Sequence, residues 1–450
     1  MNPILKPNEN CGNKKIGEGD IEMKQNTYEE LLKRNFNISD KIIELSKSTK
    51  DELCNYFNYI DELADYNQLK VICAMKDCGL SDFHLNDSTG YGYNDMGREI
   101  IENIFKEVFK SEDALVRSQI ISGTHAITLC LFGILRPGDE LLSITGSPYD
   151  TLKDVIQGDN CGSLKEFGVI YDEVKLKHGK PDYETIARKI NKKTKMVLIQ
   201  RSKGYSLRPA LNVDEIRDLV QYVKNIKTDI ICLVDNCYGE FVDFTEPTEV
   251  GADLCAGSLI KNPGGGIAPT GGYVVGKSDL VEQASYRLSA PGIGKNCGPT
   301  LSVNRLILQG LFYAPKIVGE ALKGSVYISR IMELAGFDVF PKYNQRRGDI
   351  VTAIAFESSE KLITFCKGLQ KVGPVDAHVS PEPWAMPGYD HQVIMAGGSF
   401  IQGASIELSV DAPIREPYIA YIQGGLNFAH IKLGTMSALN ELYKKGYLKI

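Results

Sequence analysis

The sequence predicts an α/β protein whose larger part is a mostly parallel β-sheet with helices on both faces. Short apolar runs of strand length alternate with amphipathic segments of helical period between residues 113 and 276. This alternation is typical of parallel sheets, because parallel strands are joined by helical crossovers. Turn sequences such as RPGDE (136–140) separate the segments. At 450 residues the chain is long enough for two or three domains.

The predicted elements follow one another in a regular order. The first 25 residues are polar and are expected to form a loose leader, and apolar residues at helical spacing predict helices from Tyr28 to about Lys76. Strands are then predicted at 114–121, 141–145, 166–174, 195–201, 229–236, 252–260 and 271–277, and helices at 124–135, 149–157, 183–190 and 212–225. A helical stretch at 301–336, whose glycines are candidate break points, leads to a smaller mixed α/β unit with elements at 337–341, 349–356, 361–369, 399–410 and 418–433. We therefore expect an N-terminal leader and helical arm over 1–75, a large domain over 76–330 and a small C-terminal domain over 331–450.

Charge, cysteine usage and hydropathy restrict the function classes. A formal net charge of -6 argues against a nucleic-acid partner, since phosphate-binding surfaces need an excess of Lys and Arg, and favours a small-molecule partner. The cysteines number 11, several lie in apolar runs and no CxxC occurs, which favours buried single thiols and a reducing cytoplasm. No segment reaches the roughly 18 apolar residues of a membrane span, and the N-terminus lacks the apolar core of a signal peptide. We expect a cytoplasmic protein without a membrane partner.

Two strand-to-helix junctions are candidate ligand contacts, because ligands of open α/β sheets bind at the carboxyl ends of strands. Ser122 and Gly123 end a predicted strand, and Thr124 and His125 begin a helix whose free N–H groups suit a phosphate. Such junctions are often only turns. Tyr149 stands at the next junction, where an aromatic ring can cover a flat ligand, although a capping loop with an edge aromatic is the plainer interpretation.

A carboxylate and a lysine follow later strands. Asp235 ends an apolar strand, where an ionised carboxylate needs a cationic or hydrogen-bonding partner; an Asx turn is the alternative. Lys261 lies between the apolar Leu259 and Ile260 and a run of glycines. Most lysines are solvated, but these apolar neighbours argue against a solvated loop here. A lysine partly desolvated near cationic or apolar groups has a lowered pKa and can form a Schiff base.

A nucleotide-binding P-loop is the rival explanation for glycines beside a lysine. That motif requires GxxxxGK followed by Ser or Thr at a helix start, whereas here Lys261 precedes the glycines and the strand GGYVVG follows. The order of residues therefore argues against nucleotide hydrolysis.

In this order, the phosphate-type turn, aromatic, aspartate and lysine resemble fold type I pyridoxal 5'-phosphate (PLP) enzymes. The segments ISGTHAITLCLFGILRPGDELL, VDNCYGEF and GSLIKNPGGGIAPTGGYVVG resemble those of the cystathionine and methionine gamma-lyase family, and most of all its methionine gamma-lyase-like, aluminium-resistance bacterial members. The resemblance covers roughly residues 80–412. It implies the fold type I architecture, with a large PLP-binding domain and a smaller C-terminal α/β domain.

The resemblance also implies roles for individual residues. Lys261 would hold PLP and move the Cα proton, Asp235 would pair with the pyridinium nitrogen, and Tyr149 would stack on the ring. The N–H groups of Gly123 and Thr124, with His125 adjacent, and the Ser258 hydroxyl would hold the phosphate. Tyr91 and Tyr93 of a neighbouring subunit would complete this phosphate site.

Departures from the family pattern concern mainly the substrate. The arginine that accompanies the family's tyrosine is missing, which leaves an anion contact from Arg98 or elsewhere open, and the threonine before the lysine is Ile260. The family's asparagine near the ring oxygen has no match in QRSKGYSLRP (200–209). Glu407 stands near the position of the arginine that binds the substrate carboxylate, and Arg415 is the nearest replacement, with a solvated loop arginine as the alternative.

The resemblance thus implies a PLP-dependent carbon–sulfur lyase acting on a cystathionine, methionine or cysteine type of amino acid. β- or γ-elimination would yield a thiol, a keto acid and ammonia. An aminotransferase or aldolase of the same fold, and a non-catalytic PLP-binding homologue, remain alternatives. The family's shared active sites imply a homodimer or homotetramer.

Overall fold

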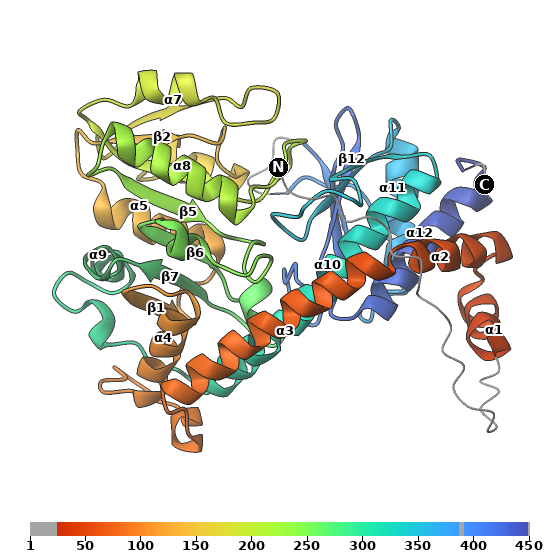
Figure 1. Ribbon diagram of the computed structural model, residues 1–450, viewed down its shortest axis with the longest axis horizontal. Helices are drawn as coiled ribbons and strands as arrows, with labels where there is room; N and C mark the ends of the chain where they lie inside the picture. Colours follow the sequence, from red (N-terminus) through yellow and green to blue (C-terminus); the bar gives the residue numbers. More distant parts are fainter. Residues whose placement is uncertain (1–24, 387–390, 449–450) are drawn as a thin grey trace.

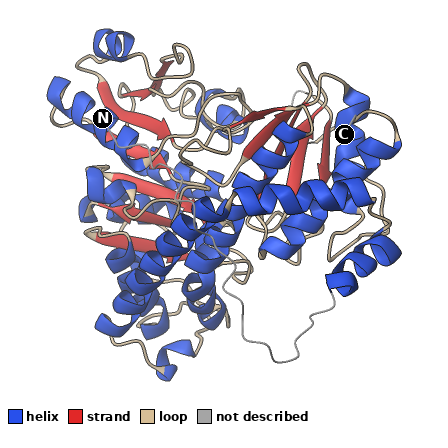
Figure 2. Cartoon of the chain, turned by 45° about the vertical axis from the view of Figure 1, so that its right-hand side comes forward, coloured by secondary structure: helices blue, strands red, loops and turns tan. Residues whose placement is uncertain are grey.

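The computed structural model describes residues 25–386 and 391–448. Two separate β-sheets and the helices around them make up the chain, and two long helices run between the sheets (Figures 1 and 2). The predicted loose leader lies outside the described residues, except for its last residue, with which the first helix begins.

The larger sheet has seven strands in the order β1-β7-β6-β5-β4-β2-β3. In chain order the strands are β1 (Asp113–Arg117), β2 (Glu140–Ser143), β3 (Ile170–Glu173), β4 (Thr194–Gln200), β5 (Ile231–Asp235), β6 (Leu254–Ser258) and β7 (Gly272–Gly276). The pairs among β2 to β6 are parallel, whereas β7 is antiparallel to both β6 and β1. The predicted, mostly parallel sheet is confirmed.

Helices cover both faces of this sheet. One face packs on α5 (Gly123–Ile134), α6 (Asp150–Gln157) and α9 (Ser278–Leu288), and the other on α4 (Met96–Val108), α7 (Tyr183–Lys189) and α8 (Val213–Ile226). Helices α5 to α8 coincide with predicted ones, whereas α4 and α9 were not predicted; the α9 segment SDLVEQASYRL carries few apolar residues. Four short 3-10 helices lie at Asp82–Leu85 (η1), Pro247–Val250 (η2), Asn262–Gly264 (η3) and Gly294–Asn296 (η4).

The N-terminal helices α1 (Gln25–Phe36), α2 (Asp40–Glu52) and α3 (Cys54–Asp77) confirm the predicted helical arm. Helix α3 lies beside α10 (Asn304–Leu334), and the pair runs from the larger sheet to the smaller one (Figure 1). The glycines of α10 do not break it. A Cβ on Gly310 would lie 2.3 Å from the carbonyl oxygen of Gly264, so glycine here lets the η3 loop approach the helix.

The smaller sheet has five antiparallel strands in the order β10-β11-β12-β9-β8. The strands are β8 (Asp338–Phe340), β9 (Thr352–Ala355), β10 (Val393–Ala396), β11 (Ser409–Pro413) and β12 (Ile419–Gln423), and α11 (Ser359–Gln370) and α12 (Phe428–Lys444) accompany them. The segment 399–410, expected to form an element of this unit, is mostly a loop, and β11 begins only at Ser409. The Glu407 side chain accepts hydrogen bonds from the backbone N–H groups of Phe400 and Ile401, which folds this segment into a loop.

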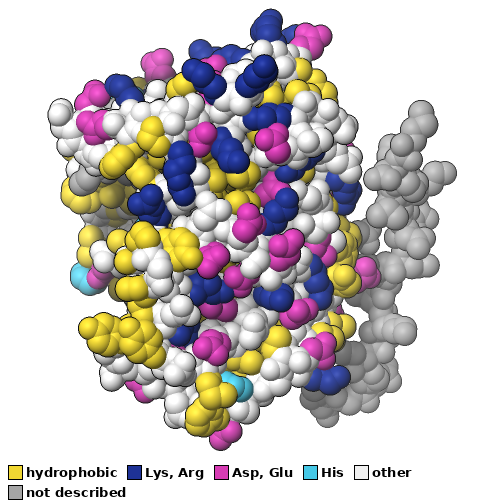
Figure 3. All heavy atoms as spheres, turned by 90° about the vertical axis from the view of Figure 1, so that its left-hand side faces the viewer, with side chains coloured by type: hydrophobic (Ala, Val, Ile, Leu, Met, Phe, Trp, Pro, Cys, Tyr) yellow, Lys and Arg dark blue, Asp and Glu magenta, His cyan; other side chains and the backbone are white. Residues whose placement is uncertain are grey.

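Charged side chains of both signs are mixed on the face drawn in Figure 3, without a large area of one sign. In the part of the chain that the structure describes, no helix combines the length and apolar character needed to cross a membrane.

Candidate functional site

The carboxyl ends of the parallel strands β4, β5 and β6 lie at the same side of the larger sheet. This arrangement brings Asp235 and Lys261 together. Asp235 is the last residue of β5 and pairs in register with Ala256, two residues before Ser258 ends β6. One carboxylate oxygen of Asp235 accepts the Cys237 N–H at 3.2 Å. Burial raises the pKa of Asp235, although the charge of Lys261 opposes this rise. The carboxylate is thus placed where a cationic ligand would stabilise it.

Lys261 follows β6 directly and precedes η3. Its amine lies over the Tyr238 ring, 4.1 Å from the ring centroid, a distance suited to a cation–π contact. Burial lowers the pKa of the Lys261 amine, but acidic groups around it outweigh burial and raise the pKa above its ordinary value; they belong to Cys237, Tyr238, Asp235 and Glu240. The lowered pKa expected from the sequence is therefore wrong for the protein without a ligand, because acidic groups surround the amine.

The turn after β5 presents Tyr238 to the lysine in an unusual backbone conformation. Tyr238 and Phe241 have φ angles of 71° and 61°, which bulky side chains rarely adopt. Asn236 fixes the start of the turn, because its N–H donates to Ala256 and its side-chain oxygen accepts from Arg201 at 2.8 Å. Strain of this kind is frequent at functional sites, where the surrounding structure holds it in place.

The N-terminus of α5 lies against this turn. A Cβ on Gly123 would be 2.7 Å from the Cys237 sulfur and 3.7 Å from the Ser258 Cβ, so three segments of the predicted site meet here. The Ser122 hydroxyl accepts the His125 N–H at 3.0 Å and caps the helix. Within residues 25–386 and 391–448, the N–H groups of Gly123 and Thr124 have no acceptor and can receive an anion.

The side chains of the other predicted phosphate residues already have partners. The Thr124 hydroxyl bonds to that of Thr151 at 2.6 Å, and the Ser258 hydroxyl accepts the Ile260 N–H at 3.3 Å. The His125 ring accepts the Ile121 N–H at 3.3 Å, and burial lowers the pKa of His125. The Ser258 hydroxyl accepts a bond here and so keeps its own proton for an anion, beside the backbone N–H groups of Gly123 and Thr124.

Tyr149 lies at the start of α6 and begins a row of aromatic rings. Its ring is 5.8 Å from that of Tyr205, which in turn is 5.2 Å from that of Tyr421 on β12. The Tyr205 hydroxyl donates to Asp411 on β11 at 3.0 Å. Arg415 is exposed and donates to the Tyr205 carbonyl at 3.3 Å, so it lies beside this row. The smaller sheet thus contributes one wall next to Tyr149.

Tyr91 and Tyr93 lie on the surface and stack on each other, with ring centroids 5.4 Å apart. Their exposed fractions, 73% and 59%, leave both rings available to another molecule. Arg98 is buried and donates to the carbonyls of Gly92 and Gly298 at 2.6 and 2.9 Å. Arg98 therefore anchors the loop that carries Tyr91 and Tyr93.

Several neighbours of Lys261 and Asp235 were not singled out from the sequence. Tyr238 lies within the VDNCYGEF segment, so its position after Asp235 was an available signal. Asp411 and Arg208 interact electrostatically with Lys261 and Asp235, respectively, although 150 and 27 residues separate each pair along the chain. No local pattern could have identified these two, because only the folded chain brings them to the site.

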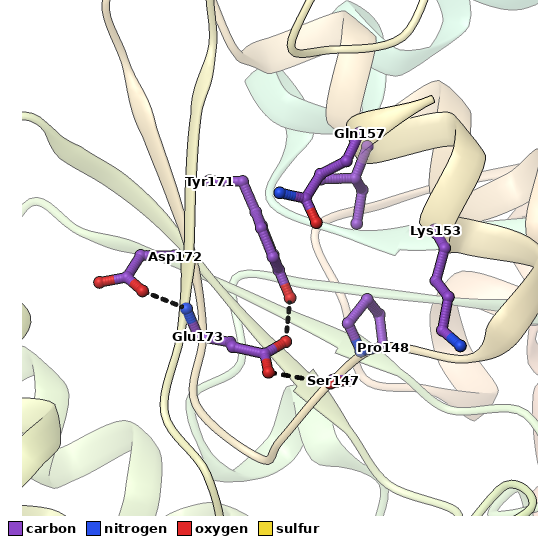
Figure 4. Close-up of a pocket in the computed structure, with 8 residues that line it drawn as sticks. Ser147, Pro148, Lys153, Gln157, Tyr171, Asp172 and Glu173 are labelled. Carbon is purple, nitrogen blue, oxygen red and sulfur yellow. Dashed lines mark hydrogen bonds between the residues drawn. The ribbon is translucent and has the colours of Figure 1, made fainter. Parts of the chain in front are cut away.

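A cavity of about 390 Å³ lies between the Ser147–Pro148 loop, helix α6 and strand β3 (Figure 4). The Tyr171 and Ser147 hydroxyls both donate to Glu173 in its wall, at 2.8 and 2.9 Å. Neither Asp235 nor Lys261 lines it, so we do not assign the proposed chemistry to this cavity.

The chain is similar to several known proteins over nearly its whole length. An uncharacterized protein, YnbB, of Bacillus subtilis (strain 168) is 49% identical over 423 residues, which cover 93% of this chain and 98% of that protein. A structure of a carbon-sulfur lyase involved in aluminum resistance from Clostridium novyi NT has a TM-score of 0.89 and 52% identity, covering 93% of this chain and 99% of the other. A proposed cystathionine beta-lyase involved in aluminum resistance from Clostridium acetobutylicum has a TM-score of 0.90 and 50% identity, with 92% and 99% covered.

A more distant likeness concerns the fold alone. The pyridoxal-5'-phosphate dependent protein YhfS from Escherichia coli has a TM-score of 0.58 at 16% identity and covers 86% of this chain. The architecture is that of the fold type I PLP enzymes, as expected from the sequence. The family model described as methionine gamma-lyase matches residues 42–443, and the chain belongs to this family.

Proposed function

We propose that the protein is a PLP-dependent carbon–sulfur lyase that acts on a sulfur-containing amino acid of the cystathionine, methionine or cysteine type. The observation that carries the proposal is the meeting of Asp235 and Lys261 at one edge of the sheet, with the lysine amine over Tyr238. Family membership and the carbon-sulfur lyase from Clostridium novyi support it. The products would be a thiol, a keto acid and ammonia, after β- or γ-elimination.

The residues present fit PLP. Lys261 would hold its aldehyde carbon covalently, and the buried Asp235 would pair with the ring nitrogen. The open N–H groups of Gly123 and Thr124 suit its phosphate, and the Tyr149 ring at the start of α6 would stack on its ring. A neighbour of the same fold, a proposed O-acetylhomoserine (thiol)-lyase from Campylobacter jejuni with a TM-score of 0.52, contains N'-pyridoxyl-lysine-5'-monophosphate. Ser258 and His125 would support the phosphate from the adjacent strand and helix turn.

When bound, PLP supplies an electron sink for the bond broken at the substrate Cα. The protein must then supply a base, and Lys261 is the base that we propose. A cationic ring nitrogen would neutralise Asp235 and so remove one of the charges that raise the pKa of Lys261. Cofactor binding would in this way make the lysine amine easier to deprotonate. Lys261 would take the Cα proton and return it later in the reaction.

A second copy of the chain would complete the site. Tyr91 and Tyr93 are exposed on either side of Gly92, whose carbonyl Arg98 binds, and we propose that they reach the phosphate in a neighbouring subunit of a homodimer or homotetramer. Arg415, beside Tyr205, is the proposed contact for the substrate carboxylate. We propose a cytoplasmic location, which suits a protein with ten described free cysteines.

The lysine tests the proposal. Lys261→Ala protein should release no measurable thiol or keto acid from cystathionine, methionine or cysteine, while the wild-type protein turns over at least one of them. Lys277→Ala is a matched control, because Lys277 follows the neighbouring strand β7 and is half exposed, and its buried partner Asp253 keeps a second ion pair with Lys224. If Lys261→Ala protein kept the wild-type rate, the lysine would not be the catalytic group.

A non-catalytic PLP-binding protein is the second candidate, and one observation favours it. Glu407, near the family's carboxylate-binding arginine, is buried and anchors a loop. A yellow protein whose spectrum no amino acid changes would support this candidate. The same screen, run with keto acids as amino acceptors and with β-hydroxy amino acids, separates the lyase from an aminotransferase or an aldolase.

A further inference from the structure

Glu240 is a buried carboxyl group with an incomplete set of hydrogen bonds. Its side chain is 0% exposed, and the Tyr273 hydroxyl donates to Oε1 at 2.7 Å. Oε2 has no hydrogen-bond partner among the described residues. If the only role of Glu240 were to accept the Tyr273 bond, its second oxygen would be buried at a cost in free energy, since an unsatisfied buried polar atom is unfavourable.

The segment that carries Lys261 is built around this carboxyl group. A Cβ on Gly257 would lie 2.6 Å from Glu240 Oε1, so glycine in this strand admits the carboxyl group. Asn262, which follows the lysine, donates from its side chain to the Glu240 carbonyl at 3.0 Å. Tyr238 and Phe241, on either side of Glu240 in the chain, have the strained positive φ angles. The backbone is thus strained on both sides of Glu240, in the turn whose Tyr238 ring lies under the lysine amine.

Lys261 is the cation that interacts with Glu240 in this cluster. The other titratable groups around Glu240 are Tyr273 on β7, Cys255 on β6, and Glu246 and Cys237 on the segment after β5. The groups that face Lys261, besides Glu240, are Asp235, Cys237 and Tyr238 after β5, and Asp411 on β11. Burial raises the pKa of Glu240 to about 8, so its charge changes near neutral pH.

We propose that Glu240 is a positioning residue for Lys261. The carboxyl group of Glu240, buried in the Cys237–Phe241 turn, sets the charge of the lysine amine. The inference concerns the lysine amine itself and rests on the proposed function only for its consequence in catalysis. Below pH 8 Glu240 is neutral and has little influence. Above pH 8 its negative charge holds Lys261 as an ammonium ion, which cannot attack an aldehyde, and so extends the pH range in which the amine is unreactive.

The test measures the reactivity of the Lys261 amine without any cofactor. Full-length protein, freed of carbonyl compounds with hydroxylamine, is labelled with trace acetic anhydride across a pH series, and acetylation of the Lys261 peptide is measured by mass spectrometry. Glu240→Gln keeps the shape and the Tyr273 bond but cannot ionise. Well above pH 8 its Lys261 should react about three- to tenfold faster than in the wild type, the change that half to one unit of lysine pKa produces. Well below pH 8 the two proteins should react alike.

Glu246→Gln is the matched control, because Glu246 is also fully buried after β5 but binds Asn236 and the Phe241 N–H. Well above pH 8, where Glu240 is ionised in both proteins, it should leave Lys261 reactivity unchanged; nearer pH 8 the onset of the Glu240 effect should move to a lower pH, because the charge of Glu246 raises the pKa of Glu240. Tyr273→Phe is a second variant that keeps Glu240. Loss of the hydroxyl removes a bond that lowers the pKa of Glu240, so the effect of Glu240 on the lysine should begin at a higher pH than in the wild type. Equal reactivity of Glu240→Gln and wild-type protein at every pH, or equal effects of Glu240→Gln and Glu246→Gln, would overturn the inference. Because acetylation needs no PLP, failure of the proposed lyase function would appear separately, as a protein that does not bind PLP.

Discussion

Replacing Asp235 by Asn should separate the stability of the protein from its affinity for PLP. The Cys237 N–H donates to one oxygen of Asp235 at 3.2 Å, and an asparagine oxygen can keep this bond. The loss is then only the extra strength of a bond to a charged acceptor, about 1 kcal/mol. Burial raises the pKa of Asp235, so its ionised form is disfavoured in the fold and removing the charge offsets that loss. We expect the free energy of unfolding of cofactor-free Asp235→Asn protein to stay within about 1 kcal/mol of wild type, or to rise.

The same substitution should weaken PLP binding. A buried hydrogen bond to a charged group contributes about 1.5 to 3 kcal/mol, which corresponds to a loss of about tenfold to about 150-fold in affinity. Stability should also change with pH in a defined direction. Because the folded pKa of Asp235 lies above the unfolded value, the folded state binds more protons, and its stability falls as the pH rises through that folded pKa. Asp235→Asn protein should lose this part of the pH dependence.

Urea unfolding of the cofactor-free proteins at several pH values measures the stability, and absorbance titration with PLP measures the affinity. The reasoning would be refuted if Asp235→Asn protein bound PLP as tightly as wild type. It would also be refuted if the variant lost more than about 3 kcal/mol of stability, because the carboxylate would then be a structural group.

Two further predictions concern the loop anchor and the exposed tyrosines. Glu407→Ala should lower the free energy of unfolding by about 2 to 4 kcal/mol in urea, because the N–H groups of Phe400 and Ile401 lose a charged acceptor; a loss under about 0.5 kcal/mol would contradict the anchoring role. The double substitution Tyr91→Ala and Tyr93→Ala should leave the unfolding of the subunit nearly unchanged, since both rings are exposed, but should weaken PLP binding at least about tenfold if a partner's site uses them; unchanged PLP affinity would place the phosphate contacts within one chain.

The strands and the two central site residues could be predicted because the signals are local. Asp235 and Lys261 each follow an apolar run of strand length, and the parallel connection of those strands brings their ends to one edge of the sheet. The chain order then places a carboxylate next to a lysine without any knowledge of side-chain contacts.

The environment of the lysine could not be predicted in the same way. The direction of its pKa shift depends on the turn that carries Tyr238 and Glu240, and this turn has strained φ angles that sequence patterns do not encode. Asp411 comes from the other sheet, so its contribution depends on how the two sheets pack. Glu407 was recognised as a departure from the family, but its role as a loop anchor required the bonds to Phe400 and Ile401.

The measurement that tests the central claim most directly is the visible absorption spectrum of the purified protein after addition of PLP, followed by borohydride reduction and peptide mapping. The account predicts a yellow protein and a pyridoxyl group on Lys261, with no such group on Lys277. A protein that stays colourless and carries no modification at Lys261 would contradict the account, because Asp235 and Lys261 would then share one edge of the sheet without holding the cofactor.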